Sequence, residues 1–416
     1  MQLSRRVTSL KPSVTVAFTN RAKQLRASGR DVLIFAAGEP DFDTPEHVKD
    51  AAIEALRAGQ TKYTPTLGDA ETRSAIAEKL TQENGIPGLA GEHVAIGAGG
   101  KHVLYSAMHA LFDPPEDGEE PWELLLPTPA WVSYAPIVRL AGGAVREIPA
   151  GPDTAFKITP EQLRGAITPR SRCLVLNSPS NPCGTMYTED ELRGLAVVVE
   201  EAARGVAPDL VVLSDEIYEK ITYGGIPHFS IGSVAEIADR VITLNGLSKA
   251  YAMTGWRAGY VAMPGDFGKR LIKSLGTLQG QMTTNITSFV YPAIRRAIRH
   301  AGPDADRMRD AFAIRAELIH GLLTAIPGVS CPRPTGAFYV FPDISGLFSK
   351  ASPAGKPIAS ASDLAEALLE ERDLAFVPGE DFGPPGQNHV RISFACSEDT
   401  IREGMRRFAN FVGSMG

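Results

Sequence analysis

The fold is decided by residues 241–260, which read VITLNGLSKAYAMTGWRAGY. The apolar run 241–245 predicts a buried strand. Lys249 comes just past the end of this strand, and α/β enzymes carry their chemistry at strand ends of this kind. A lysine in this place is either a solvated surface charge or a nucleophile that forms a Schiff base. The residues that accompany Lys249 along the chain distinguish the two interpretations.

The size and charge of the chain narrow the classes of protein to which it can belong. It has 416 residues, of which 44% are hydrophobic, and a formal net charge of −6. This length predicts two or three domains, or one large and one small domain, with ample material for a core. A negatively charged chain without a basic run is not expected to bind nucleic acid.

The cysteines and histidines give no sign of a metal centre. The four cysteines contain no CxxC pair and the eight histidines contain no HExxH motif, so neither a disulfide scaffold nor a zinc site is expected. The N-terminal charges have no apolar segment behind them, and no apolar run is long enough to span a membrane. We therefore expect a cytoplasmic protein without a bound metal and without a membrane partner.

The middle of the chain alternates between strands and helices. Strands are expected at 94–96, 122–126, 144–148, 173–177, 210–214 and 241–245. Helices are expected at 101–112 and 189–204. Apolar, β-branched strands separated by helices are typical of a parallel sheet that is covered on both faces. The predicted fold class is therefore α/β.

The two ends of the chain have a different pattern. Ahead of the sheet we expect a polar arm, a strand at 32–35, and helices at 16–26, 44–57 and 69–84. Beyond residue 300 we expect strands at 336–341, 374–377 and 389–394, a polar loop at 349–362, and helices at 305–323, 362–372 and from 398 onward. The predicted organisation is an N-terminal arm (1–15), a large domain (46–304), and a smaller α+β domain that combines 16–45 with 305–416.

Two turns that follow strands carry residues suited to binding. Gly99, Gly100 and Lys101 open a helix, where bare backbone N–H groups favour an anion. The alternative is a tight strand–helix turn without a ligand. The segment 177–184 is fixed by two prolines and a glycine, and it is either a plain turn or a loop that presents Asn181.

Asp215 ends the most apolar strand of the chain. A carboxylate is costly to bury unless a positive charge pairs with it, and a protonated ring nitrogen would be such a partner. The alternative is an N-cap for a following helix. Tyr218 lies three residues further on and is expected on the same side of the turn.

Arg391 and Trp131 complete the candidate residues. Arg391 lies in a strand with alternating apolar neighbours, and it is either a bidentate ligand for a carboxylate or one half of a structural ion pair. Trp131 follows a strand and either stacks on a planar ring or belongs to the core.

In combination these motifs resemble one family. Residues 246–249, with Arg257 and Gly259, resemble the pyridoxal-phosphate attachment signature of the class I aminotransferases of fold type I. The Asn-Pro-x-Gly turn, the Asp-Glu-x-Tyr segment and the late arginine occur in the order of that family. The resemblance covers nearly the whole chain. Within the family it is strongest to bacterial aspartate aminotransferases of the subgroup that includes some prephenate aminotransferases, on the segments 37–45, 62–65 and 252–257.

The resemblance implies a large domain with a mostly parallel sheet flanked by helices, a smaller α+β domain and an N-terminal arm. It also implies ping-pong transamination with pyridoxal 5′-phosphate as the cofactor. Lys249 would bind the cofactor covalently and then carry a proton, Asp215 would pair with the pyridine nitrogen, and Tyr218 would hydrogen-bond the ring hydroxyl. The phosphate would be held by Arg257 and by the backbone amides of Gly99, Gly100 and Lys101.

The substrate residues are implied in the same way. Trp131 would stack on the cofactor ring, and Asn181 would contact both the ring oxygen and the substrate. Arg391 would clamp the substrate α-carboxylate with help from the backbone of Gly38. In this family Tyr63 reaches the phosphate of the other subunit's cofactor, which implies a homodimer with shared active sites.

Two positions depart from the familiar pattern. Gly246 stands where several aspartate aminotransferases have a serine that contacts the phosphate, so one hydrogen bond fewer is expected. Cys183 replaces the usual threonine of the Asn-Pro-Thr-Gly turn, and this change is expected to be mild.

The choice of substrate depends on fewer residues. In the resembled subgroup a lysine after the Gly-Gly turn and a threonine in the arm meet the side-chain carboxylate, and here these are Lys101 and Thr15. This pair favours the amino acids aspartate and glutamate, with 2-oxoglutarate as the 2-oxo acid acceptor. Prephenate and aromatic substrates are alternatives, and Lys101 is otherwise a neighbour of the phosphate or a solvated charge.

Two other classes of protein share this fold. A carbon–sulfur lyase or an aminocyclopropane-carboxylate synthase would need no acceptor oxo acid, and the pair Lys101 and Thr15 argues against it. The aminotransferase-like half of a transcriptional regulator would carry a basic helix-turn-helix domain ahead of the fold. Here we expect the fold to begin within the first few dozen residues, and the net charge is negative.

Overall fold

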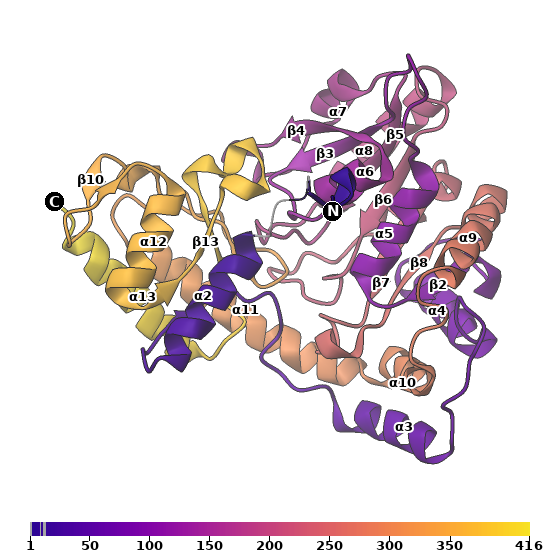
Figure 1. Ribbon diagram of the computed structural model, residues 1–416, viewed down its shortest axis with the longest axis horizontal. Helices are drawn as coiled ribbons and strands as arrows, with labels where there is room; N and C mark the ends of the chain where they lie inside the picture. The colour runs from indigo at the N-terminus through magenta and orange to yellow at the C-terminus, as the bar shows by residue number, and fades with distance from the viewer. Residues whose placement is uncertain (1, 9, 11–13) are drawn as a thin grey trace.

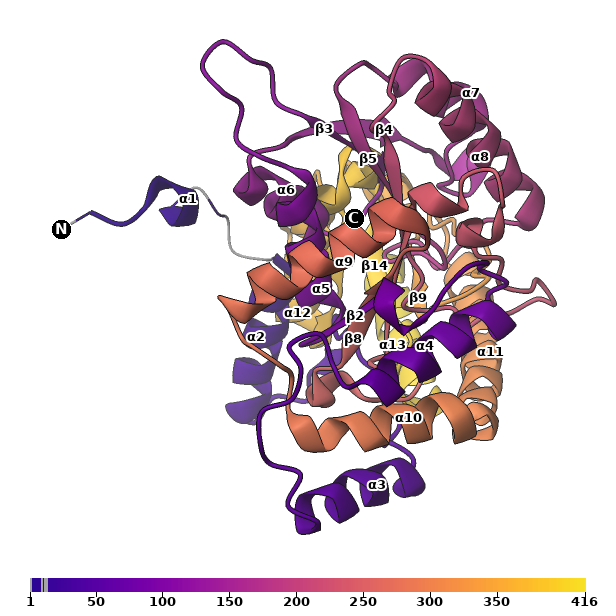
Figure 2. The ribbon, with the colours of Figure 1, turned by 90° about the vertical axis from the view of Figure 1, so that its right-hand side faces the viewer.

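The computed structural model describes the chain except for residues 1, 9 and 11–13 and the side chains of residues 14 and 15. Figure 1 shows a large sheet with helices on both faces and, beside it, a smaller group of short strands and helices that contains the C-terminus. Helix α1 (Arg5–Thr8) projects from the body of the molecule, as Figure 2 shows. In the part of the chain that is described, no helix is both long and apolar enough to cross a membrane.

A seven-stranded sheet of order β2-β8-β7-β6-β5-β3-β4 forms the centre of the larger part. Its strands are β2 (Val94–Gly97), β3 (Glu123–Thr128), β4 (Ala144–Pro149), β5 (Ser171–Asn177), β6 (Val211–Asp215), β7 (Val241–Gly246) and β8 (Gly259–Ala262). Neighbouring strands are parallel, except that β8 runs antiparallel to both β2 and β7. The predicted mostly parallel sheet is confirmed. Strand β8 was not predicted, because its apolar run is short and directly follows the Lys249 segment.

Successive residues of the strands pack against opposite layers of helices. The face of β3 that includes Leu124 packs against α5 (Gly100–Leu111), α6 (Tyr134–Ala141) and α9 (Gly265–Gly280). The face that includes Leu125 packs against α7 (Pro160–Ala166) and α8 (Glu189–Arg204). The edge made by β2 and β8 is covered by α3 (Glu46–Arg57), α4 (Ala70–Glu83) and α10 (Tyr291–His300). Burial on both faces explains the continuous apolar runs of the inner strands such as β6 and β7.

Two of these helices begin at reciprocal side-chain caps. At α8 the Thr188 hydroxyl accepts from the Glu191 amide, and the Glu191 carboxylate accepts from the Thr188 amide at 2.8 Å. Thr159 and Gln162 form the same pair at α7. Such pairs satisfy amides that have no partner within the helix, so the helix starts at a defined residue.

The smaller part contains an antiparallel sheet of order β13-β14-β9. Its strands are β9 (Tyr339–Val340), β13 (Val377–Pro378) and β14 (Val390–Ser393). Strand β1 (Leu33–Ile34) pairs in parallel with β12 (Leu374–Ala375), which joins the beginning of the chain to its end. The helices of this part are α2 (Val14–Ala27), α11 (Gly302–Thr324), α12 (Ala361–Arg372) and α13 (Glu398–Gly413).

Several strands of the smaller part are shorter than predicted. The strand expected at 336–341 is reduced to β9, because Ala337 adopts a φ of 56° and Pro342 has no amide to donate. The loop expected at 349–362 contains a short antiparallel pair, β10 (Lys350–Ala351) and β11 (Pro357–Ile358). The domain limits predicted after residues 45 and 304 stay a prediction, since one hydrophobic cluster joins Tyr218 of the larger part to Phe312 of the smaller.

The first residue of β8 lies against the turn that opens α5. A Cβ atom built on Gly259 would lie 2.4 Å from the backbone nitrogen of Gly100 and 2.5 Å from the carbonyl carbon of Gly99. Gly99 has a φ of +90°, which side chains disfavour. Glycine at these positions therefore allows β8 and the turn to touch.

Replacement of Gly259 by alanine is expected to lower the free energy of unfolding by roughly 1–3 kcal/mol, because the added methyl group has to displace backbone atoms. Gly321→Ala in α11 is the control, since a Cβ built on Gly321 meets nothing within 4 Å. That change is expected to be neutral or to stabilise by roughly 0.5–1 kcal/mol. Urea unfolding followed by circular dichroism measures both, and an unchanged stability of Gly259→Ala would contradict the close approach.

Candidate active site

The carboxyl ends of β5, β6 and β7 open into a cavity of about 280 Å³, whose opposite wall includes residues of β9 and β14. Ligands of open α/β sheets bind at this edge. Ten residues that the sequence indicated line the cavity: Gly38, Gly100, Lys101, Trp131, Asn181, Asp215, Tyr218, Lys249, Arg257 and Arg391.

Lys249 lies in the turn after β7 and is partly buried in the cavity wall. Its Nζ donates a hydrogen bond to the backbone carbonyl of Gly38. Burial lowers the pKa of Lys249 to about 8, against the opposite effect of the Glu39 carboxylate. An amine with this pKa is neutral near physiological pH far more often than a surface lysine. The geometry therefore favours the interpretation of Lys249 as a nucleophile.

Asp215 is the last residue of β6, and its buried side chain lines the same cavity. Its carboxylate accepts hydrogen bonds from the Tyr134 hydroxyl at 2.7 Å and the Ile217 amide at 3.2 Å, both of which are neutral donors. Burial raises the pKa of Asp215 to about 6 in spite of these hydrogen bonds. A turn follows Asp215, so the alternative of an N-cap is wrong. A positive group bound in the cavity would lower this pKa again.

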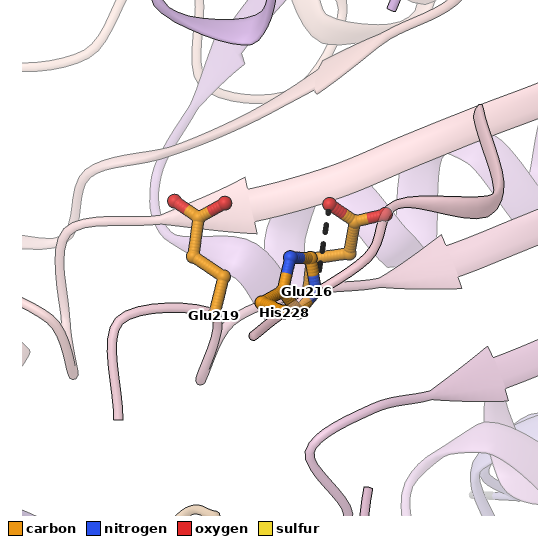
Figure 3. Close-up of side chains that lie close together, drawn as sticks. All are labelled: Glu216, Glu219 and His228. Atoms are coloured by element: carbon orange, nitrogen blue, oxygen red, sulfur yellow. Dashed lines mark ion pairs between the residues drawn. The ribbon is translucent and has the colours of Figure 1, made fainter. Parts of the chain in front are cut away.

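The turn after β6 presents acidic residues to two sides. Asp215 and Tyr218 line the cavity, whereas the carboxylates of Glu216 and Glu219 lie in a buried cluster beside His228, as Figure 3 shows. The side chains of Glu216 and Glu219 are only 1% and 7% exposed. Two further acidic residues therefore anchor the turn that carries Asp215.

Lys79 on α4 supplies a positive charge to this buried cluster. Its ammonium donates to Glu219 and, at 2.8 Å, to Oδ1 of Asn84, whose Nδ2 donates to Glu216 at 2.9 Å and to Glu219 at 2.7 Å. Burial alone would raise the pKa of Glu219, but the charge of Lys79 helps to lower it to about 2. Glu216, Glu219 and His228 lie close enough to share a metal ion. Because the Lys79 ammonium already provides a cation, we infer no metal site here.

Another part of the cavity wall is positively charged. Gly100 begins α5, and the backbone N–H groups at a helix start favour anions. Arg257 lies over the same turn, and a Cβ atom built on Gly99 would lie 2.5 Å from its Nη2. Lys101 adds a second cation, whose Nζ is 4.8 Å from the centre of the Trp131 ring. A helix start with two cations and bare glycines is suited to a phosphate group.

The wall formed by β14 carries Arg391, whose side chain is buried. Nη1 donates to Oδ1 of Asn181 at 3.0 Å and Nη2 donates to the carbonyl of Ala36 at 2.9 Å. Among the described residues Nε has no hydrogen-bond partner. Both partners of the guanidinium are neutral, so the arrangement favours a receptor for an external carboxylate over a structural ion pair.

Three predicted residues do not line the cavity. Gly99 lies next to it, under the guanidinium of Arg257. Tyr63 is 88% exposed and contributes nothing to the cavity of its own chain. Thr15 belongs to α2, and its side chain lies outside the described residues.

This geometry agrees with a comparison to known protein families. The sequence pattern of the family described as aminotransferase class I and II matches residues 30–408. The chain belongs to this family. The protein is therefore an aminotransferase, and the predicted family is confirmed.

Individual relatives resemble this aminotransferase over the full length of both chains. It is 41% identical over 413 residues to the aspartate aminotransferase of Bacillus subtilis, with 99% of each chain covered. It is 42% identical over 417 residues to the aspartate/prephenate aminotransferase of Cereibacter sphaeroides, again with 99% of each covered. The structure of the Thermus thermophilus aspartate aminotransferase with maleate matches with a TM-score of 0.88 and 41% identity, covering 99% of this chain and 100% of that one. These matches confirm the predicted fold type.

Sequence reasoning missed several residues of the aminotransferase cavity. They are Tyr134, Asn177, Ile217, Leu244, Ser248, Thr254 and Tyr339. Tyr134 lies at the start of α6, three positions after the candidate residue Trp131. This short distance along the chain was the signal in the sequence that could have identified it. Tyr339 stands in an alternating apolar strand, where nothing local distinguishes it from a core residue.

In the cofactor-free enzyme, Lys249 is expected to be methylated by formaldehyde and a reductant. The rate of this reaction should rise with pH with a midpoint near 8. Only the neutral amine attacks the aldehyde, and burial lowers the pKa of Lys249 to about 8. Ordinary surface lysines, with a pKa of about 10.4, should react with a correspondingly higher midpoint in the same experiment. Mass spectrometry of the modified peptides gives both profiles. A Lys249 midpoint equal to that of the surface lysines would show that burial does not activate this amine.

Proposed function

We propose that this aminotransferase binds pyridoxal 5′-phosphate and transfers the amino group of L-aspartate to 2-oxoglutarate by a ping-pong mechanism, with oxaloacetate and L-glutamate as products. The observation that carries the proposal is that one cavity combines Lys249, Asp215 and Arg391. They provide a reactive amine, a buried anion for a ring nitrogen, and a cation for an α-carboxylate.

The residues fit this cofactor at two places. A side chain at Gly99 would collide with the guanidinium of Arg257, so the glycine keeps the approach to that cation and to the start of α5 open for a phosphate. Asp215 is buried with neutral donors only, and burial raises its pKa to about 6. A protonated pyridine nitrogen would provide the counter-charge that this carboxylate needs.

When bound, pyridoxal phosphate supplies a sink for the electrons released at the substrate Cα. Asp215 would hold the proton on the ring nitrogen, and Tyr218 would donate to the ring oxygen. Lys249 would attach the cofactor in the absence of substrate and would then move the proton at the substrate Cα, a task that suits an amine with a pKa near 8. Trp131 would cover one face of the ring, and Arg391 would orient the substrate through its α-carboxylate.

The preference for a dicarboxylate is supported by Lys101. This residue lines the cavity with its ammonium over the Trp131 ring, so a second cation is available in addition to Arg391. Two cations suit a substrate with two carboxylates. The Bacillus subtilis relative is named for aspartate, and the Thermus thermophilus structure contains maleate, which is a dicarboxylate. Thr15 stays a predicted partner of the second carboxylate.

Prephenate is the second candidate substrate. It also carries two carboxylates, and the Cereibacter sphaeroides relative is named an aspartate/prephenate aminotransferase. The same two cations would bind it, so the shape of the cavity around the ring would decide between the two substrates.

We also infer a homodimer with shared active sites. Tyr63 exposes 88% of its surface, and Ile53, Leu56 and Met282 are apolar side chains that are also exposed. A second copy of the chain would bury this surface and would bring Tyr63 to the cofactor phosphate of its partner. The cytoplasmic location stays a prediction.

Aspartate added alone to the enzyme loaded with pyridoxal phosphate is expected to convert the absorption of the bound cofactor to that of the pyridoxamine form, with release of oxaloacetate. Lys249→Ala is the control, and it should slow this conversion by several orders of magnitude, because it removes the amine that moves the proton. Stopped-flow absorbance measures both rates. The proposal fails if neither aspartate nor glutamate changes the spectrum.

Lys101→Met is expected to raise the KM for aspartate about 10- to 100-fold, because it removes a charged hydrogen bond to the second carboxylate. The KM for alanine, which lacks that carboxylate, should change little. Lys273→Met, an exposed lysine of α9, is the matched control. Steady-state kinetics with aspartate and alanine measures both KM values. An equal rise in KM for the two amino acids would assign Lys101 to the phosphate and not to the second carboxylate.

A further inference from the structure

Tyr339 on β9 has no role in the proposed function, yet it lies between two residues that do. Its side chain is buried and lines the cavity. Its hydroxyl oxygen is 3.0 Å from that of Tyr218, and the guanidinium carbon of Arg391 lies 4.8 Å from the centre of its ring. One side chain of the smaller sheet thus contacts both the residue that would meet the cofactor ring and the residue that would bind the substrate.

The hydrogen bond between the two tyrosines can run in either direction, because each hydroxyl has one hydrogen and can also accept. If Tyr218 donates to Tyr339, it has no hydrogen left for an acceptor in the cavity. If Tyr339 donates, the hydrogen of Tyr218 is free. An anionic oxygen bound in the cavity therefore selects the second direction, in which Tyr339 is the first donor of a chain and strengthens the donation by Tyr218.

The surrounding backbone holds the Tyr339 hydroxyl at this point. A Cβ atom built on Gly38 would lie 2.9 Å from the hydroxyl oxygen, so the hydroxyl packs against a residue that has no side chain. The carbonyl of the same Gly38 accepts the hydrogen bond of Lys249. The pairing of Tyr339 with Ser393 places it beside the strand that carries Arg391.

We propose that Tyr339 is a positioning residue, whose hydroxyl fixes the direction in which Tyr218 donates and whose ring supports the guanidinium of Arg391. The inference rests on the proposed function, since Tyr218 and Arg391 act only if the cofactor and an α-carboxylate bind there. A guanidinium is attracted to the face of an aromatic ring. The binding of the substrate carboxylate and the hydrogen bonding of the cofactor ring are therefore linked through one side chain.

Tyr339→Phe removes the hydroxyl and keeps the ring. Without the Tyr339 hydroxyl, Tyr218 is a weaker donor and stabilises the anionic ring oxygen of the bound cofactor less. The nitrogen that shares a proton with this oxygen therefore holds the proton more tightly. The pH midpoint of the visible absorption of the bound cofactor is expected to rise by about 0.5 unit. The kcat with aspartate should fall about 3- to 10-fold, whereas the KM should change less than about twofold, because the ring still supports Arg391.

Tyr339→Leu also removes the ring and is expected to raise the KM for aspartate about 10-fold in addition. Tyr223→Phe is the matched control. Tyr223 is buried in the same hydrophobic cluster and its hydroxyl donates to the carbonyl of Ala337, so this variant loses the same group without touching Tyr218. Tyr223→Phe should leave the pH midpoint of the cofactor absorption unchanged. Thermal unfolding of all three variants loaded with the cofactor reports any general loss of stability.

A midpoint of Tyr339→Phe equal to that of the unsubstituted enzyme overturns the inference, and so does a shift that Tyr223→Phe reproduces. These outcomes leave the proposed function intact, because the unsubstituted enzyme still binds the cofactor and titrates. An unsubstituted protein that shows no cofactor absorption after loading overturns the proposed function together with the inference.

Discussion

The burial of the Asp215 carboxylate is the constraint on which the rest of the site depends. Its pKa rises from 3.8 to about 6, which corresponds to about 3 kcal/mol held against the charged form. This net shift already includes the hydrogen bonds from the Tyr134 hydroxyl and the Ile217 amide, both of which favour the charged form. A cation that entered the cavity at the end of β6 would recover this free energy by stabilising the charged carboxylate.

The same turn shows how the surroundings shift the pKa of neighbouring carboxyl groups in opposite directions. Within residues 215–219, burial raises the pKa of Asp215 and of Glu216. Burial acts on Glu219 in the same direction, but the surrounding charges, that of Lys79 foremost, outweigh it and lower the pKa of Glu219 to about 2. Glu216 is satisfied by neutral donors, Ser214 at 2.9 Å and Ser230 at 2.6 Å among them. The two glutamates are thus saturated within the protein, and Asp215 alone is left for a ligand.

The sequence predicted those features that depend on local pattern. Apolar runs identified the strands of the large sheet except β8, because most of these strands are buried on both faces. The residues at the strand ends identified most of the cavity. Lys79 could not be recognised, since within its helix it reads as a solvated lysine and only the packing of α4 against the sheet buries it. The same holds for Tyr339, whose function depends on a contact with Tyr218 across 121 positions of the chain. Long-range contacts of this kind leave no local signal.

The single reversed strand, β8, has a topological consequence. Its neighbours β2 and β7 both end at the edge that bears the cavity, and because β8 runs the opposite way it begins there, with Gly246 beside Gly259 and Gly97 beside Gly259. The chain therefore leaves β7, passes Lys249 and Arg257, and re-enters the sheet without crossing to its other edge. A parallel β8 would need a crossover connection, which would carry Arg257 to the far side of the sheet. One hairpin-like reversal thus fixes the spacing between the Lys249 amine and the Arg257 guanidinium, and an insertion between residues 249 and 257 would alter that spacing.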